Sequence, residues 1–306
     1  MDCDVLVIGG GAAGLSAALV LAQARRRVLV VDAGTPRNAA AAHVHGYLFR
    51  EGAAPGDLLE LGRAEVREAG GEIVTGTVTG VRGDGRRGFE VALEGHQDVR
   101  ARRLLVATGV QDLLPDLQGL TERWGRDVLH CPYCHGQGVE DQRIGVLGTG
   151  PEGSQHALEL RQWSHDVTLF QHEPPLSGEE RRRLAARDVR VVEEPIALLV
   201  VEGDRLTGVR LAGDAFEPLV ALFVMPGCTA NDTLLTGLGC ARDESGWVRA
   251  DDTGATSVPG VWAAGNVVDS SAQVITAAGG GLTAAVAINA DLIEDDVRAA
   301  LARDRA

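Results

Sequence analysis

A Cys-Pro-Tyr-Cys segment in the middle of the chain carries the strongest chemical signal in the sequence. Cys131 and Cys134 are two residues apart, and His130 and His135 flank them. Two cysteines at this spacing can close a disulfide and reopen it, typically because a nearby positive charge or helix N-terminus favours one thiolate. Half of a zinc site and two buried thiols are the alternatives. The expected chemistry is therefore redox or metal binding, and the rest of the sequence must decide between these two.

The other cysteines favour a redox pair. Cys3, Cys228 and Cys240 stand far apart in the sequence, so no second close pair completes a four-cysteine zinc site. A mixed site that also uses the two flanking histidines stays open. An isolated C-x-x-C in a reducing compartment is more often catalytic than structural. We therefore favour a redox centre and expect no metal.

A glycine motif opens the chain in the context of a dinucleotide fold. Residues 4–8 predict a buried parallel strand, which is followed by Gly9, Gly11 and Gly14, a helix, a second strand and Asp32. The first glycine permits a tight turn, the second lets a pyrophosphate approach the backbone, and the third lets helix and strand pack closely. Asp32 would bind ribose hydroxyls. A glycine-rich turn in another kind of α/β protein is the alternative.

The same motif recurs shortly after the cysteine pair. A predicted strand at 143–147 leads into Gly148, Gly150 and Gly153, and Glu173 stands where such a fold meets the adenosine ribose. Two dinucleotide motifs that flank a C-x-x-C point to a flavin exchanging electrons with a dithiol.

The remaining elements are predicted from hydrophobic patterning. A loop precedes a helix within 35–60, and His43 and His45 in that loop could face a cofactor or be solvated. The other predictions are short strands within 72–100, a polar link at 112–118, a second sheet that continues through 189–193, 197–201 and 206–211, a helix at 275–292, and a frayed tail at 298–306.

Composition excludes several classes of function. The net charge is -14 and the pI is about 5.0, which argues against a general binder of nucleic acid or anionic membranes. The sequence contains no lysine, which excludes Schiff-base chemistry and a Walker-type phosphate site. We see no secretory signal and no apolar run of membrane-spanning length, so a cytoplasmic protein is expected.

The ordered set of motifs resembles the low-molecular-weight thioredoxin reductase family of FAD-dependent disulfide oxidoreductases over essentially the whole chain. The resemblance rests on the two glycine motifs, an Ala-Thr-Gly turn, the cysteine pair and a closing motif at 260–267. It implies an α/β fold with two Rossmann-like, three-layer dinucleotide-binding domains, the second inserted into the first. The split FAD domain would cover 1–113 and 250–306, and the inserted domain 114–249. Homodimers are usual in the family.

The resemblance also implies the cofactor sites. The expected FAD-binding residues are Gly9, Gly11, Ala12, Ala13, Gly14, Asp32, Ala33, Arg37, Asn38, Ala107, Thr108, Gly109, Gly265, Asn266, Gln273 and Val274. The second nucleotide site, which would take NADH, NADPH or nothing, would use Gly148, Gly150, Gly153 and Glu173.

The sequence departs from the family reductases at three places. His135 and Asn266 each stand where an Asp is usual, and residues 171–175 replace the His-Arg-Arg motif that binds the 2′-phosphate of NADPH. Glu173 would repel that phosphate but could bind the ribose diol of NAD. The arginines at 181–183 lie beyond two prolines and would reach the phosphate only if the loop folds back.

The Cys-Pro-Tyr-Cys-His-Gly pattern resembles the family's dithiol oxidase branch, whose members close disulfides in small natural products and pass electrons through FAD to oxygen. In this hypothesis a substrate thiolate attacks Cys131, Cys134 lies nearer the flavin, and His135 is a general base that also holds a thiolate by its charge. A structural cap is the alternative role for His135. A reductase that passes electrons from NAD(P)H to a thioredoxin-like protein is the second hypothesis, and a flavin-based redox sensor is the third.

Overall fold

The computed structural model describes residues 2–304, which divide into two compact units. Within the described residues, the first unit comprises 2–39, 55–111 and 228–304, and the second comprises 40–54 and 112–227. The second unit therefore ends at residue 227, whereas the sequence analysis expected the inserted domain to end at 249. Residues 228–249 pack with the first unit, because Leu235, Cys240 and Val248 are buried in one of its two core clusters.

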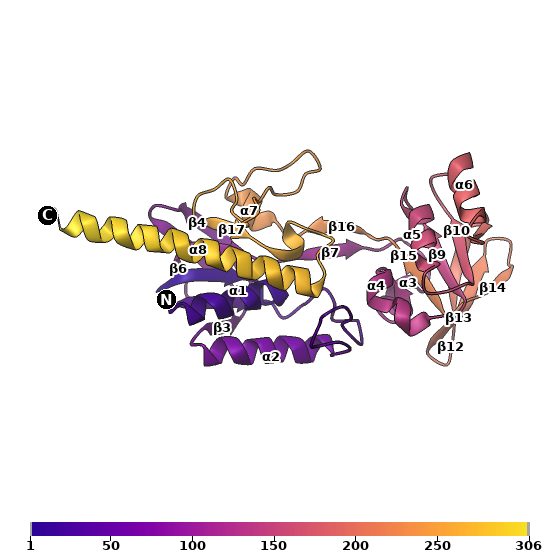
Figure 1. Cartoon of the computed structure of the whole chain (residues 1–306), viewed down its shortest axis with the longest axis horizontal. Coiled ribbons are helices and arrows are strands. Elements are labelled where there is room, and N and C mark those ends of the chain that lie inside the picture. Colours follow the sequence, from indigo (N-terminus) through magenta and orange to yellow (C-terminus); the bar gives the residue numbers. More distant parts are fainter. Residues whose placement is uncertain (1, 305–306) are drawn as a thin grey trace. The chain divides into compact units, whose positions relative to one another are not determined.

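A mostly parallel sheet forms the centre of the first unit (Figure 1). Its strand order is β3-β2-β1-β6, and the far edge of β6 is shared by β17, which is parallel, and by an antiparallel β4–β5 hairpin. The strands are β1 (Asp2–Ile8), β2 (Val28–Asp32), β3 (Glu72–Thr75), β4 (Val78–Asp84), β5 (Gly88–Leu93), β6 (Val99–Val106) and β17 (Val261–Ala263).

Helices cover this sheet, and two of them touch very closely. The helices are α1 (Ala12–Gln23), α2 (Pro55–Glu68), α7 (Thr233–Gly237), the 3₁₀ turn η2 (Gly265–Val267) and α8 (Val274–Arg303). α1 and α8 run side by side (Figure 1), and a Cβ on Gly281 would lie 2.0 Å from the carbonyl oxygen of Ala13. Only a glycine permits the helices to approach this far.

The C-terminal segment differs from the frayed tail that the sequence predicts. α8 continues to Arg303. Its later turns are held by Arg103 of β6, which pairs with Asp295 at 3.0 Å, and by Arg26 of the turn between α1 and β2, which pairs with Asp296 at 2.7 Å. Residues 305 and 306 of the expected tail lie outside the described part.

α8 also bears on the membrane prediction. By length and composition alone it could cross a membrane, so the expectation that no apolar run has that length is wrong. One side of α8 packs into the core through Gly281, Ala284, Ala285, Ile288 and Leu292. Core packing therefore accounts for the apolar residues on this side of the helix, and 28% of its most apolar stretch is buried.

A parallel sheet also forms the centre of the second unit. Its order is β11-β10-β9-β15-β8, with β8 (Val128–Leu129), β9 (Ile144–Gly148), β10 (Val167–Gln171), β11 (Arg190–Val192) and β15 (Ala221–Val224). The helices α5 (Gly153–Leu160) and α6 (Gly178–Ala185) contribute Ala157, Leu160 and Leu184 to one of the unit's core clusters.

The other core cluster of this unit is formed with a separate antiparallel sheet, which the sequence analysis merged with the parallel one. This sheet consists of β12 (Ile196–Glu202), β13 (Arg205–Leu211) and β14 (Phe216–Pro218). Its Leu199, Val209 and Leu211 pack with Leu147 and Phe170 of the parallel sheet. The result is three layers, as in a Rossmann-like fold.

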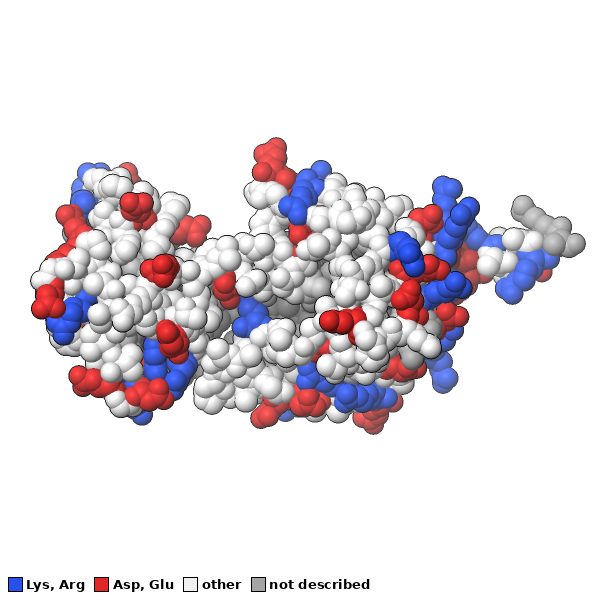
Figure 2. All heavy atoms as spheres, turned by 180° about the vertical axis from the view of Figure 1, so that it is seen from behind, with Lys and Arg blue, Asp and Glu red and all other residues white. Residues whose placement is uncertain are grey.

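Short elements complete the second unit and its ends. They are α3 (Leu120–Arg123), α4 (Pro132–His135) and the 3₁₀ turn η1 (Gly136–Val139), while β7 (Val110–Leu113) pairs with β16 (Gly227–Ala230). On the face drawn in Figure 2, arginines and acidic side chains are interspersed over both units. That face carries no extended basic field of the kind that a general polyanion binder needs.

Candidate active site

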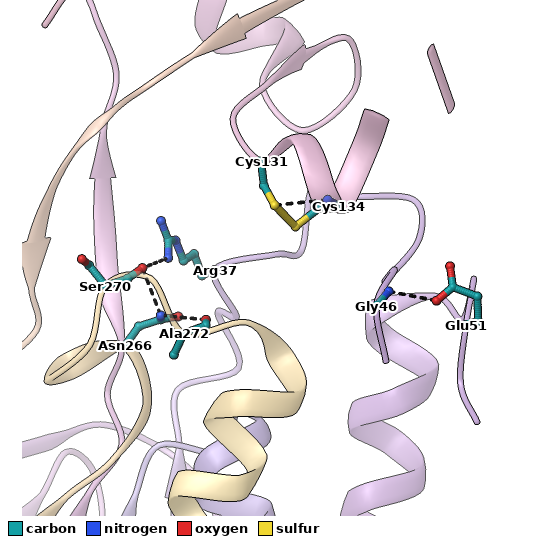
Figure 3. The surroundings of a disulfide bond; sticks show 8 residues. All are labelled: Arg37, Gly46, Glu51, Cys131, Cys134, Asn266, Ser270 and Ala272. Carbon is teal, nitrogen blue, oxygen red and sulfur yellow. Dashed lines mark hydrogen bonds between the residues drawn. A yellow bond between two sulfur atoms is a disulfide. The ribbon is translucent and has the colours of Figure 1, made fainter. Parts of the chain in front are cut away.

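Cys131 and Cys134 form a disulfide at the start of the short helix α4 (Figure 3). Cys131 is the N-cap residue, and its Sγ accepts a hydrogen bond of 3.1 Å from the backbone N–H of Cys134. Pro132 occupies the first helical position, where its missing N–H costs nothing. The helix start therefore offers a hydrogen-bond donor to the Cys131 sulfur.

The two cysteines are unequally covered. Cys131 is 6% exposed, whereas Cys134 is only half-buried. Cys134 is thus the more exposed residue of the pair, whereas the mechanism that the sequence predicts begins with attack on the buried Cys131. Between them, Tyr133 is 71% exposed and its ring packs edge-on against Trp163, with centroids 5.3 Å apart. The exposed side of the pair therefore has an aromatic border.

His135 follows the pair as a neutral side chain. Burial lowers the pKa of His135 to about 4, and His130 and His45 lower it further by repulsion. The imidazole is therefore neutral near neutral pH, whereas the sequence analysis expected it also to hold a thiolate by its charge. A thiolate formed beside it would favour its protonation. The disulfide state therefore fits a base better than a cation.

The first glycine motif has the shape of a dinucleotide cradle. A Cβ on Gly9 would lie 2.4 Å from the carbonyl oxygen of Ala107, and one on Gly14 would lie 1.9 Å from that of Gly9. A Cβ on Gly11 would meet nothing within 4 Å. Two glycines are therefore required by the protein's own packing, while the space beside Gly11 is open, at the N-cap of α1, where no side chain caps the helix. This geometry fits a pyrophosphate.

Asp32 is held from two sides at the end of β2. Its carboxylate accepts hydrogen bonds from the N–H of Gly10 at 3.2 Å and from Arg63 at 2.9 Å. Each oxygen retains a lone pair for a ribose hydroxyl. Arg63, on α2, is a supporting residue that the sequence did not indicate, because nothing in a helical pattern marks which arginine reaches a distant strand end.

Asn231 is a second residue that sequence reasoning missed. Its side-chain amide donates to the backbone carbonyl of Thr108 at 2.9 Å, and its backbone carbonyl accepts from the Thr108 hydroxyl at 2.7 Å. Its backbone N–H donates to Gly109. These bonds fix the Ala107-Thr108-Gly109 turn, in which Gly109 has a φ of +71° and open space around it.

The closing motif positions a loop and an arginine. The Nδ2 atom of Asn266 shares its two N–H groups among the carbonyls of Asp269 at 2.9 Å, Ser270 at 3.3 Å and Ala272 at 3.1 Å. An aspartate could not donate these bonds. The carbonyl of Ser270 also accepts from Arg37 at 3.1 Å (Figure 3).

The other predicted FAD residues lie in the same unit, at the ends of its elements. Ala12 and Ala13 begin α1, Gln273 is the N-cap of α8 and Val274 is its first residue. Gly265 begins η2, and Ala33 and Asn38 lie in the segment after β2. The structure thus brings all sixteen predicted positions into the first unit.

The second glycine motif repeats the geometry of the first. A Cβ on Gly153 would lie 2.8 Å from the Cα of Gly148, whereas one on Gly150 would meet nothing within 4 Å. Glu173 is exposed just after β10, and its backbone N–H donates to the carbonyl of Gly148 at 3.1 Å. The cradle therefore fits a dinucleotide.

The loop after β10 folds back, which bears on the predicted arginines. Arg181 approaches Gln171 at 3.4 Å and pairs with Glu193 at 2.6 Å, and Arg183 bonds Gln155 at 3.1 Å. Arg181 thus lies near the end of β10, although Glu193 already balances its charge.

Comparison with known proteins decides the family. The model of the pyridine nucleotide-disulphide oxidoreductase family matches residues 3–281. The chain belongs to this family. A crystal structure of HlmI shares 53% sequence identity and a TM-score of 0.95, with 99% of this chain and 97% of that chain covered. A putative thioredoxin reductase TrxB from Bacillus anthracis shares 30% identity and a TM-score of 0.91, with 96% and 99% covered. The thioredoxin reductase sirT of Leptosphaeria maculans is 29% identical, with 97% of this chain and 96% of the relative covered.

Membership explains what the two cradles and the disulfide have in common. The protein is an FAD-dependent thiol–disulfide oxidoreductase of the thioredoxin reductase-like type, with the two-domain α/β fold of that type. FAD is its cofactor, and NAD(P)H is the usual reductant among thioredoxin reductases. Among residues 2–304 no group of three or more metal-binding side chains is arranged around an ion site.

Proposed function

We propose that the protein is a dithiol oxidase, which closes a disulfide in a small-molecule dithiol and transfers the electrons through FAD to oxygen. The observation that carries the proposal is the half-buried His135 directly after the Cys131–Cys134 disulfide, where family reductases usually have an aspartate. A neutral imidazole can take a proton from an incoming thiol. The structural unit containing the pair needs no nucleotide for that step.

The chain's own residues carry out the thiol chemistry. His135 removes a proton from one substrate thiol, and the resulting thiolate attacks Cys131, so that Cys134 leaves as a thiolate. The second substrate thiol, also deprotonated, attacks the mixed disulfide and releases Cys131. The substrate has then lost two protons and two electrons, and the enzyme pair has gained the two electrons.

FAD would be held by the cradle of Gly9, Gly11 and Gly14, by Asp32, and by the closing motif. When bound, the flavin supplies a two-electron acceptor for the reduced pair that oxygen can regenerate. Around it, Asn231 and Asn266 keep the turn and the loop in place, and Arg63 orients Asp32.

A reductase is the second candidate, and the second glycine cradle favours it. In that case NAD(P)H supplies electrons and a thioredoxin-like protein receives them. Glu173 favours the ribose diol of NADH over a 2′-phosphate, and Arg181 is the opposing feature because it lies near the end of β10. We therefore expect NADPH to be a poor reductant of this protein.

Anaerobic stopped-flow absorbance of the FAD-loaded protein separates these candidates. We expect dithiothreitol to bleach the flavin rapidly, air to restore the colour with formation of peroxide, and NADPH to act slowly. Rapid, saturable bleaching by NADPH with none by a dithiol would replace the oxidase with a reductase. Slow reaction with every donor would favour a redox sensor.

The protein is further proposed to act in the cytoplasm as a homodimer formed through α8. The outer side of α8 exposes Ile275, Leu282, Val286, Ile293 and Val297, which are 42–56% exposed. Their spacing of 7, 4, 7 and 4 residues keeps them on one stripe of the helix. A second copy of the same helix would cover this stripe in a two-fold contact.

A further inference from the structure

Tyr133 lies between the two cysteines of the redox pair and is largely exposed. The Cα atoms of Cys131 and Cys134 are 5.2 Å apart, so Tyr133 stands within one helical turn of both. Tyr133 is 71% exposed, whereas Cys131 is only 6% exposed. A tyrosine that served the core would bury its ring and expose only its hydroxyl. Core packing therefore does not account for this residue.

Trp163, which follows α5, holds the Tyr133 ring in place. The two rings pack edge to face, with their centroids 5.3 Å apart and their planes at 90°. Trp163 itself lies against Gly136, where a Cβ would be 2.6 Å from the Cγ atom of the indole. Its backbone carbonyl accepts a hydrogen bond of 2.9 Å from the N–H of Asp141. Both contacts are with the segment that follows the cysteine pair, so the indole fixes one side of the Tyr133 ring.

A fixed and exposed aromatic ring beside a reactive disulfide has the properties of a recognition surface. Aromatic side chains offer a large contact area and lose few rotamers on binding, and a ring that is already held in place loses fewer still. Aromatic residues make up only 4% of the sequence, yet two of them are packed together here. An apolar ring of a ligand can pack on the exposed side of Tyr133 in an offset or edge-on geometry. A polar chain gains much less from such a surface.

We propose that the exposed side of the Tyr133 ring binds the apolar body of the dithiol substrate while its thiols react at the Cys131–Cys134 disulfide. The inference rests on the proposed dithiol oxidation and names its substrate class, which is a small dithiol whose thiols are attached to an apolar ring. Tyr133 is then a specificity-determining residue that takes no part in proton or electron transfer. Its removal weakens the binding of such a dithiol and leaves the thiol exchange itself unchanged.

Anaerobic stopped-flow bleaching of the FAD-loaded, full-length protein by two dithiols tests this proposal. ortho-Benzenedimethanethiol carries its thiols on an apolar ring, whereas dithiothreitol carries them on a polar chain. For Tyr133→Ala we expect the half-saturating concentration of ortho-benzenedimethanethiol to rise about fivefold to tenfold, with a limiting rate within about twofold of wild type. The rates with dithiothreitol should be unchanged.

Two variants and one ligand without thiols sharpen the result. Tyr133→Phe keeps the ring and loses only the hydroxyl, so it should behave as wild type. Phe216→Ala removes another exposed aromatic side chain of the same unit (46% exposed) and should leave the reaction with both dithiols unaffected. ortho-Benzenedimethanol should compete with ortho-benzenedimethanethiol in the wild type and not in Tyr133→Ala, which reports binding separately from the redox reaction.

An unchanged half-saturating concentration of ortho-benzenedimethanethiol in Tyr133→Ala would overturn the recognition role and leave the oxidase proposal standing. An equal loss with both dithiols would also overturn it, because it would show a general defect of the redox pair. A loss in Tyr133→Phe as large as that in Tyr133→Ala would assign the effect to the hydroxyl and overturn it likewise. If neither dithiol bleaches the wild-type flavin, the proposed oxidase and this recognition role fall together.

Discussion

At the scale of single residues, a buried histidine predicts how the protein responds to acid. His156 on α5 is 4% exposed, and neither ring nitrogen has a hydrogen-bond partner of normal geometry among residues 2–304. Burial lowers the pKa of His156 from 6.5 to about 4, and the backbone of His130 offsets this only in part. The folded state thus keeps the ring neutral where the unfolded chain binds a proton.

The free energy of unfolding should therefore be highest above about pH 6.5 and fall as the pH drops toward about 4, by roughly 2 kcal/mol from this residue. His156→Leu should flatten that part of the profile in urea titrations. His96→Ala, which changes an exposed histidine, is the control. An unchanged acid slope in His156→Leu would contradict the assignment.

Also at this scale, the glycines of the nucleotide motif could be predicted from the sequence, but the residues that hold Asp32 and the Ala107-Thr108-Gly109 turn in place could not. Gly9, Gly11 and Gly14 follow from chain-local rules about turns and helix starts. Arg63 and Asn231 reach their partners across long sequence separations, and no spacing rule marks them. Burial lowers the pKa of His135, with smaller contributions from His130 and His45, and a sequence does not show burial.

At the scale of elements, the contact between α1 and α8 allows a paired test. Gly281→Ala places a Cβ against the backbone of Ala13, so we expect destabilisation of about 1–3 kcal/mol and weaker FAD retention, because both helices begin beside the cradle. Gly280→Ala, one residue earlier, meets nothing within 4 Å and should stabilise the helix by about 0.5–1 kcal/mol. Thermal unfolding and bound-flavin absorbance measure both. Equal behaviour of the two variants would show that the close approach is unimportant.

Elements were predicted well where periodicity is local, and less well where pairing is distant. The strand at 4–8 lies within β1, and both glycine motifs precede helices. The strands β12 and β13 were assigned to the wrong sheet, because a short apolar run does not indicate which strand it pairs with. α8 was predicted too short because the ion pairs that hold its later turns come from β6 and from the turn after α1, which are distant in the sequence.

At the scale of the whole molecule, the outer stripe of α8 predicts the oligomeric state. Val286→Glu together with Ile293→Glu should convert a dimer into a monomer, since two charges would have to be buried in the contact. Light scattering after size-exclusion chromatography reports the mass. Val201→Glu alters an exposed valine of β12 (41% exposed) and should leave the dimer intact. A monomeric wild-type protein at micromolar concentration would refute the dimer.

The split of the first unit into three chain segments has a consequence for biosynthesis. β1 and α1 are the first elements made, yet β17 and α8, which complete their sheet and core, are the last. Residues 112–227 form most of the second unit as one stretch and can fold while the ribosome is still at work. The sheet and the core of the first unit stay incomplete until β17 and α8 have been made. We therefore expect capture of the flavin to follow the synthesis of β17 and α8.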